Sequence, residues 1–292
     1  MATKSIIVGV DDSAGAGDAL RWALTEADLH DAQVTAVLAW GFLDQHQAIP
    51  AERFDPTYGA DEAAGALRSH LTAAIGAERA ARVLATAVCD LPARALLDAS
   101  RQADLLVVGA RGLGGFEGLL LGSVSQHCLH HSAVPIAVVR VGPTREGRPP
   151  RVVVGVDGSD NAQHALRWAL EEARCRTAQL DVVTAWQLPP TGGVPSAAAV
   201  DPIVYDRAAL RVAANAVATE ADADLTAVRT RALAGHPADV LLDAAADADL
   251  LVVGSRGHGA FRRALLGSVA THITHHATCP VVVVPMPDRA EP

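Results

Sequence analysis

The chain has 292 residues, of which half are hydrophobic and 20% are charged, and its formal net charge is −9. A composition this apolar excludes a disordered protein, and no apolar run approaches the roughly 20 residues that span a bilayer. The negative charge argues against a general affinity for nucleic acid or for an anionic membrane. Because the first predicted strand starts a few residues after Met1, we expect no signal peptide and a cytoplasmic location.

The chain alternates between short apolar runs and amphipathic segments, a pattern that predicts strands and helices in turn. In the first half, strands are expected at 5–11, 33–40, 82–88, 104–110 and 135–141, and helices at 14–30, 60–77, 92–101 and 122–132. In the second half, strands are expected at 151–157, 179–186, 225–233, 249–255 and 280–286, and helices at 160–176, 202–222, 237–246 and 267–277. Between them, glycines, prolines and charges predict a linker over 142–150. We therefore expect a first domain over 1–141 and a second over 151–287.

The two halves are copies of one another. The sequence IIVGVDDS at 6–13 corresponds to VVVGVDGS at 152–159, an offset of 146 residues, and from Pro92 and Pro237 onward the offset is 145. A repeat of this length indicates duplicated domains rather than a solenoid. In each domain, five strands separated by helices predict a parallel sheet covered on both faces. The expected fold class is therefore α/β, with two Rossmann-like domains in tandem and the flavodoxin-like strand order 3-2-1-4-5.

A glycine-rich spacing follows the fourth predicted strand of each half. Two glycines three positions apart are followed, after nine residues, by Gly-Ser; the positions are Gly109, Gly112, Gly122 and Ser123, and again Gly254, Gly257, Gly267 and Ser268. Glycine lets backbone amides approach a phosphate closely, and a helix N-terminus adds favourable partial charge. This is not a Walker A loop, since Lys4 is the only lysine in the chain. The motif predicts a lysine-free phosphate cradle.

An aspartate stands at the end of the first strand of each half. Strands 1 and 4 are neighbours in the expected order, so Asp11 and Asp157 should lie beside the first glycine of each motif. Such a carboxylate can accept hydrogen bonds from ribose hydroxyls or from a base amine. The alternative is that it caps the next helix, a role that Ser13 and Ser159 could share.

The candidate ligand-binding residues all lie at these strand ends and loops. They are Asp11, Gly109, Gly112, Gly122, Ser123, Val124 and Ser125 in the first half, and Asp157, Gly254, Gly257, Gly267, Ser268 and Val269 in the second. The donors expected to hold phosphates are the amides of Gly112, Gly122, Ser123 and Val124 and the Ser123 hydroxyl.

Three features together resemble the universal stress protein family over nearly the full chain: the openings VGVDDS and VGVDGS, the two glycine motifs, and the endings HSAVP at 131–135 and HATCP at 276–280. Both halves keep the G-x2-G-x9-G-(S/T) pattern of the ATP-binding branch of that family. The resemblance implies ATP bound at the strand ends, with magnesium as a possible companion. In that arrangement the aspartate lies near the nucleoside and the Gly-Ser segment lies on the phosphates. One position departs, because Ser125 corresponds to Ala270, which puts a phosphate contact from that hydroxyl in doubt in the second half.

The resemblance also implies that the two domains pair through their last strands. These strands, 136–139 and 281–284, are short and apolar, and exposed apolar edges tend to find partners. In a tandem chain they can find each other. A homodimer through other faces remains open.

Two further sets of side chains could carry chemistry. The four cysteines, Cys89, Cys128, Cys175 and Cys279, have no CxxC or metal-type spacing, which favours reduced packing residues. The histidines cluster as His127, His130 and His131, and again as His272, His275 and His276. Their i, i+3, i+4 spacing could bind a metal, but no carboxylate or cysteine occupies a matching repeated position. The pattern favours a polar helix face, and we expect no metal site.

No arrangement typical of catalysis stands out: there is no GxSxG and no repeated carboxylate pair near the glycine loops. The favoured interpretation is a cytosolic, ATP-binding regulatory or stress-response module that is not an enzyme or at most hydrolyses ATP weakly. One alternative is a slow ATPase or a nucleotide-dependent transferase. Another is a purely structural pseudo-dimer that binds no nucleotide.

Overall fold

The computed structural model describes residues 3–41, 59–112, 120–140, 147–188, 201–220, 227–258 and 265–286. The chain forms two compact units, one from each half of the sequence. Most of the expected linker, 142–146, lies outside the described residues. Across the described part, no helix combines the length and the apolar character that a bilayer crossing requires.

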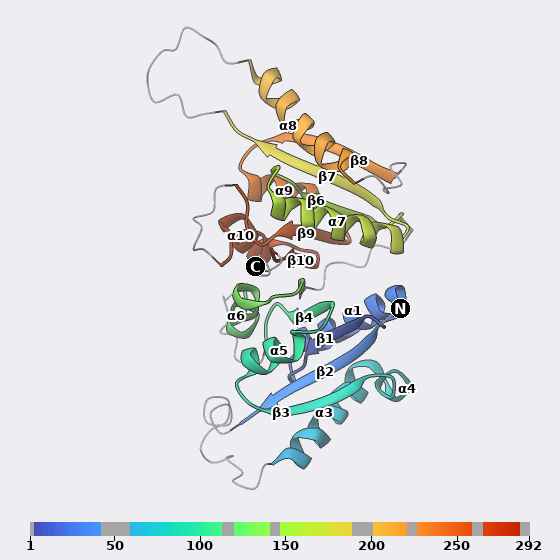
Figure 1. The fold of residues 1–292 in the computed structure, drawn as a ribbon. Helices are drawn as coiled ribbons and strands as arrows, with labels where there is room; N and C mark the ends of the chain where they lie inside the picture. Colours follow the sequence, from blue (N-terminus) through green and yellow to red (C-terminus); the bar gives the residue numbers. More distant parts are fainter. Residues whose placement is uncertain are drawn as a thin grey trace, which may run out of the picture. The chain divides into compact units, whose positions relative to one another are not determined.

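The first unit alternates strands and helices along the chain (Figure 1). Its elements are β1 (Ser5–Gly9), α1 (Ala14–His30), β2 (Gln33–Trp40), α3 (Ala60–Ile75), α4 (Ala77–Ala80), β3 (Leu84–Cys89), α5 (Pro92–Ser100), β4 (Leu105–Gly109), α6 (Ser123–His131) and β5 (Ile136–Val139). The strands are parallel and follow the order β3-β2-β1-β4-β5. This confirms the expected α/β class and the order 3-2-1-4-5.

The second unit repeats this arrangement. Its elements are β6 (Arg151–Gly155), α7 (Asp160–Cys175), β7 (Gln179–Trp186), α8 (Pro202–Ala218), β8 (Val228–Ala234), α9 (Pro237–Ala245), β9 (Leu250–Gly254), α10 (Ser268–His276) and β10 (Val281–Val284). Its parallel strands follow the order β8-β7-β6-β9-β10, which is again 3-2-1-4-5.

The core of each unit lies on both faces of its sheet. In the first unit, Val8 of β1 and Leu106 of β4 are fully buried. In the second unit, Val154 of β6 and Leu251 of β9 are fully buried. Helix α1 contacts α3, and α5 contacts α6. Right-handed crossovers place these two pairs on opposite faces of the sheet. Strands buried on both sides explain why the sequence shows continuous apolar runs rather than alternation.

Most element bounds differ from expectation by one to four residues, and the strands expected at 5–11 and 151–157 end at Gly9 and Gly155, so Asp11 and Asp157 lie two residues beyond their strands. Two helices also end early. The helix expected at 60–77 ends at Ile75, because Gly76 adopts a φ of +80°, and the short α4 follows it. The helix expected at 202–222 ends at Ala218, with Thr219 as its C-cap. Neither change moves a strand end at which a candidate site residue lies.

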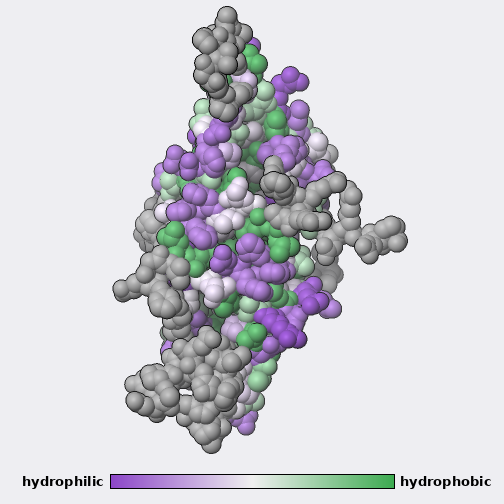
Figure 2. All heavy atoms as spheres, turned by 90° about the vertical axis from the view of Figure 1, so that its left-hand side faces the viewer, coloured by the Kyte–Doolittle hydropathy of each residue, from purple (hydrophilic) through white to green (hydrophobic). Residues whose placement is uncertain are grey.

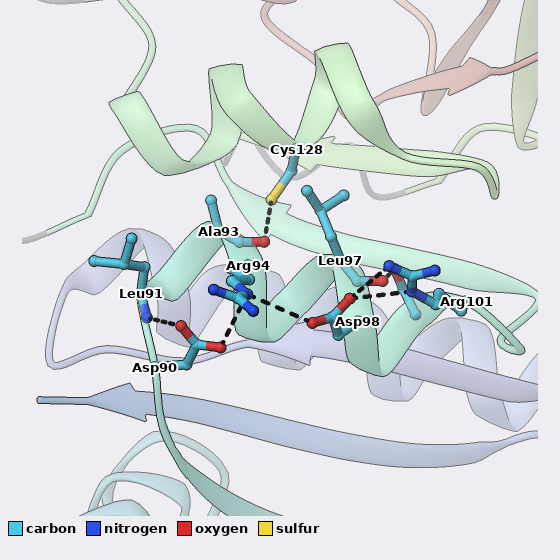
Figure 3. A network of polar contacts seen from close by, with 9 residues as sticks. Asp90, Leu91, Ala93, Arg94, Leu97, Asp98, Arg101 and Cys128 are labelled. Atoms are coloured by element: carbon cyan, nitrogen blue, oxygen red, sulfur yellow. Dashed lines mark hydrogen bonds and ion pairs between the residues drawn. The ribbon is translucent and has the colours of Figure 1, made fainter.

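Helix α5 shows how a covering helix divides its surface (Figure 3). Outward, Arg94 lies between Asp90 at 3.4 Å and Asp98 at 4.0 Å, and Arg101 pairs with Asp98 at 2.9 Å. Inward, the buried Cys128 thiol of α6 lies 4.0 Å from the Ala93 carbonyl. Charges therefore face solvent and apolar groups face α6.

On the molecular face drawn in Figure 2, hydrophilic residues are likewise interspersed among smaller apolar areas.

None of the four cysteines forms a disulfide, but only two are packing residues. Cys128 and Cys279 are buried, whereas Cys89 and Cys175 are exposed, so the packing interpretation is wrong for the latter pair. Burial raises the pKa of Cys128 to about 12, which keeps it a neutral thiol at physiological pH. Cys89 is exposed because it ends β3, the edge strand of its sheet.

Candidate functional site

In both halves, the aspartate after the first strand lies against the glycine loop after the fourth. A Cβ atom on Gly112 would lie 2.4 Å from Asp11 Oδ2, and a Cβ on Gly257 would lie 2.4 Å from Asp157 Oδ2. Only glycine allows this approach. In the second half, the His258 amide also donates to Asp157 Oδ2 at 2.8 Å. The structure thus brings together residues that the sequence separates by about a hundred positions, as the expected strand order requires.

The other carboxylate oxygen organises the start of the following helix. Asp11 Oδ1 accepts from the amide and the hydroxyl of Ser13, at 3.0 and 2.5 Å. The Ser13 hydroxyl oxygen in turn accepts from the Ala16 amide at 3.1 Å and caps α1. Asp157 and Ser159 repeat this arrangement, with Ser159 capping α7. The serines are therefore the caps, and the aspartates hold the serines in place.

Asp157 is an ionised carboxylate that remains exposed to solvent. Partial desolvation opposes its ionisation. Hydrogen bonds from Ser159 and from the His258 amide, together with the charge of His258, outweigh that cost and hold the pKa of Asp157 below its ordinary value. The group is therefore an acceptor at physiological pH, suited to hydroxyl or amine donors rather than to phosphate oxygens.

The first glycine of each motif is fixed by packing within the protein. A Cβ on Gly109 would lie 2.6 Å from the Gly15 carbonyl oxygen, and one on Gly254 would lie 2.8 Å from Asn161 Oδ1. The fourth strand therefore ends directly against the start of α1 or α7. Together with the contacts of Gly112 and Gly257, this packing explains why glycine occupies both of the first two motif positions in each half.

Among the described residues, no close contact explains the third glycine of each motif. A Cβ on Gly122 would have its nearest neighbours at 3.6 Å, and one on Gly267 at 3.4 Å, which are ordinary contacts. Their φ angles of −75° and −76° suit any residue. These glycines are the N-caps of α6 and α10, and neither provides a side chain to cap the first-turn amides. The position that most favours Ser, Thr, Asp or Asn is thus occupied by a residue that has no side chain with which to cap the first-turn amides.

Three groups near the proposed phosphate cradles donate to carbonyls of the glycine loops instead. The Gly122 amide donates to the Ala110 carbonyl at 2.8 Å, and the Gly267 amide donates to Ser255 at 2.7 Å. The buried Ser125 hydroxyl donates to the Gly109 carbonyl at 2.6 Å. Proximity in sequence could not show that these groups point back to the loop. The amides of Ser123 and Val124, and of Ser268 and Val269, lie in the first helical turns, which receive no side-chain cap from these glycines.

Sequence reasoning missed one residue of the second site. Asn161, which is 4% exposed, accepts from the Arg256 amide at 2.8 Å and donates to the Val284 carbonyl at 3.2 Å. Its counterpart in the repeat is Gly15, where a Cβ would lie 2.4 Å from the Arg111 carbonyl oxygen. The sequence signal that could have found Asn161 is its difference from Gly15 at an otherwise repeated position. A loop that a side chain supports in one half needs another support in the half that has glycine.

The histidine clusters lie on polar helix faces, as expected. The His127 and His131 rings stack at 4.3 Å, and the His272 and His276 rings at 4.4 Å. Burial, then the charges of His131 and His127, lower the pKa of His130. Among the described residues, these histidines form no group of three or more ligand atoms that all lie within 4.8 Å of one another.

Comparisons with known proteins agree with this fold. The family model of the universal stress protein family matches residues 2–140 and 150–285. A universal stress protein of Mycolicibacterium smegmatis is 34% identical, with 96% of each chain covered. One of Mycobacterium tuberculosis is 32% identical, covering 97% of this chain and 96% of the relative. A crystal structure of a universal stress protein from Archaeoglobus fulgidus superposes with a TM-score of 0.66 at 21% identity, with 97% of each chain covered.

The two units are thus tandem α/β domains with a flavodoxin-like strand order, each with an aspartate and a glycine loop at the switch point of its sheet. The chain belongs to the universal stress protein family, and it carries two copies of the family domain.

Proposed function

We propose that each half binds one adenine nucleotide, ATP with a magnesium ion, and that the protein acts in the cytoplasm as a regulatory or stress-response module rather than as an enzyme. The observation that carries the proposal is the third glycine of each motif. Against the described residues, neither Gly122 nor Gly267 is required by packing or by backbone conformation, yet both leave their helix N-terminus without a side-chain cap. A phosphate seated on the first-turn amides is the partner that such a helix end favours.

The aspartates support the other end of the same ligand. Asp11 and Asp157 lie against the second glycine of each loop, and Asp157 is ionised and exposed. A carboxylate repels phosphate but accepts from ribose hydroxyls or a base amine. The arrangement therefore suits a ligand with hydroxyl or amine donors at one end and phosphates at the other, as a nucleotide has.

Replacement of the third glycine tests the sites separately. Because a Cβ at Gly122 or Gly267 meets only ordinary contacts, we expect Gly122→Val and Gly267→Val to fold and to place their methyl groups over the helix ends. Equilibrium dialysis with ATP should count two sites in the parent chain and one in each variant. Each variant is the control for the other. Loss of both sites from one substitution, or retention of two, would contradict independent cradles.

The fate of the nucleotide separates a binding module from an enzyme. Purified protein is incubated with ATP for hours, denatured, and its nucleotide content measured. Recovery of bound ATP is expected. Steady release of ADP with turnover would favour the ATPase or transferase alternative, and absence of any affinity would favour a purely structural chain.

We also propose that the two domains pair through β5 and β10. Each is the last strand of its sheet order and is apolar, which makes an unpaired edge unfavourable. Hydrogen exchange on the full chain should find the amides of both strands protected as strongly as those of β4 and β9. Fast exchange along either strand would overturn the pairing.

A further inference from the structure

A hollow lies in the second unit near the amino-terminal ends of its strands, whereas the glycine loop lies at their carboxyl ends. It has a volume of about 670 Å³ and is lined by Arg151, Gln179, Asp181, Arg229, Thr230 and Arg231. These residues lie at or near the amino-terminal ends of β6, β7 and β8, whereas the glycine loop follows the carboxyl end of β9. The hollow is therefore separate from the proposed nucleotide site.

The strand register places its charged side chains on one face of the sheet. Arg151 pairs with Gln179, Asp181 pairs with Arg229, and Val183 pairs with Arg231. Because side chains alternate along a strand, Gln179 and Asp181 share a face with all three arginines. Three guanidinium groups thus converge on one surface of a chain whose net charge is −9.

One carboxylate organises this cluster but does not neutralise it. Asp181, whose side chain is 4% exposed, accepts from Arg151 at 2.6 Å and from Gln179 at 2.8 Å, with Arg231 more distant at 3.4 Å. Among the described residues, Arg229 has no ion-pair partner and is exposed. Asp249 accepts the Arg151 main-chain amide but does not line the hollow. The lining residues therefore carry two positive charges in excess.

The first half shows that the fold does not require these charges. The positions matching Arg151, Asp181, Arg229 and Arg231 are Ser5, Thr35, Leu84 and Thr86, by the repeat offset and the strand register. All four are neutral, and the first sheet forms with the same order. The arginine cluster is thus an addition to the second half alone.

We propose that this hollow binds a small phosphate-bearing molecule. Arg229 and Arg231 offer donor groups arranged as planar forks, which match phosphate oxygens in pairs. Asp181 holds Arg151 in a fixed orientation, which reduces the conformational freedom lost on binding. The hollow is larger than a single phosphate, so the ligand carries further groups beyond the anion.

The test uses the full chain with Gly122→Val and Gly267→Val, so that the proposed nucleotide cradles do not compete. Inorganic phosphate and pyrophosphate are titrated at low salt by calorimetry, and the Arg Nε–H signals are followed by NMR. Saturable binding that shifts the Arg229 and Arg231 signals is expected. Arg229→Ala with Arg231→Ala should weaken it by about tenfold or more.

A matched control removes the same charge elsewhere. Arg79→Ala with Arg82→Ala deletes two exposed arginines of the first half and should leave the affinity unchanged. If the Arg231 substitution lowers stability, Arg229→Ala alone is measured, because its exposed side chain makes no ion pair among the described residues. Absence of saturable binding, or equal weakening by both pairs of substitutions, would overturn the proposal. The outcome is independent of whether the glycine loops bind ATP.

Discussion

The two halves support the same glycine loop by different means. In the first half, the Gly15 backbone lies against the Arg111 carbonyl, and the Ser125 hydroxyl bonds the Gly109 carbonyl. In the second half, the Asn161 side chain holds the loop, and Ala270 replaces the serine.

The aspartate, the capping serine and the glycines are unchanged between these two arrangements. The comparison teaches that the residues facing the proposed ligand are retained while the supports behind them vary. The following variants test that division, beginning with the largest expected effect.

The aspartates should have the largest effect on ligand affinity. Asp11→Ala and Asp157→Ala each remove a charge-assisted acceptor worth roughly 1.5–3 kcal/mol, so each should weaken ATP binding in its own half by about 10- to 100-fold. Equilibrium dialysis below the melting temperature measures this, with the unaltered half as internal control. Unchanged affinity together with a lower melting temperature would assign the aspartates to helix support alone.

The second and third glycines should separate stability from binding. Gly257→Ala places a Cβ 2.4 Å from Asp157 Oδ2 and should lower the free energy of unfolding by about 1–3 kcal/mol. Gly267→Ala meets only ordinary contacts and should cost less than about 1 kcal/mol. Urea unfolding of both variants checks this. A larger loss for Gly267→Ala would show that packing, not ligand access, fixes that glycine.

Asn161 should matter for stability in the second half. Asn161→Ala leaves the Arg256 amide and the Val284 carbonyl without this partner, at a cost of about 1–2 kcal/mol. The local effect should appear as faster hydrogen exchange in the 255–258 loop, while the loop after β4 is unchanged. Equal acceleration in both loops would mean that the effect is not local.

Ser125 gives a smaller effect of the same kind. Ser125→Ala removes the bond to the Gly109 carbonyl and should lower the free energy of unfolding by about 1 kcal/mol. ATP affinity of the first half should not change, because the hydroxyl donates to the loop. A selective loss of ATP affinity without a stability change would restore the phosphate contact that the sequence suggested.

The smallest expected effect is on the stability of the second half at acid pH. Since the folded-state pKa of Asp157 is lowered, its contribution is present above the unfolded value of about 3.9 and is lost as pH falls through the folded value. Asp157→Asn should therefore flatten the fall in stability of the second half below about pH 4. Urea midpoints from pH 7 down to pH 3 measure this, and parallel curves for both chains would contradict it.

The sequence by itself determined the duplication, the α/β class, the strand order and the place of the glycine loops. Apolar runs such as 105–108 and 250–253 are long enough to identify buried parallel strands, and a repeated spacing cannot easily arise by chance. It also placed Asp11 and Asp157 beside their loops, because parallel strands bring their carboxyl ends to one edge.

Only the tertiary structure decided what each group at that edge contacts. It directed the Gly122 amide and the Ser125 hydroxyl back to the loop, gave the helix caps to Ser13 and Ser159, and brought Asn161 to Arg256. It likewise gathered Arg151, Arg229 and Arg231 around Asp181, although they come from strands far apart in the sequence. Hydrogen-bond partners depend on directions and distances between such strands, and residue type and spacing do not fix them.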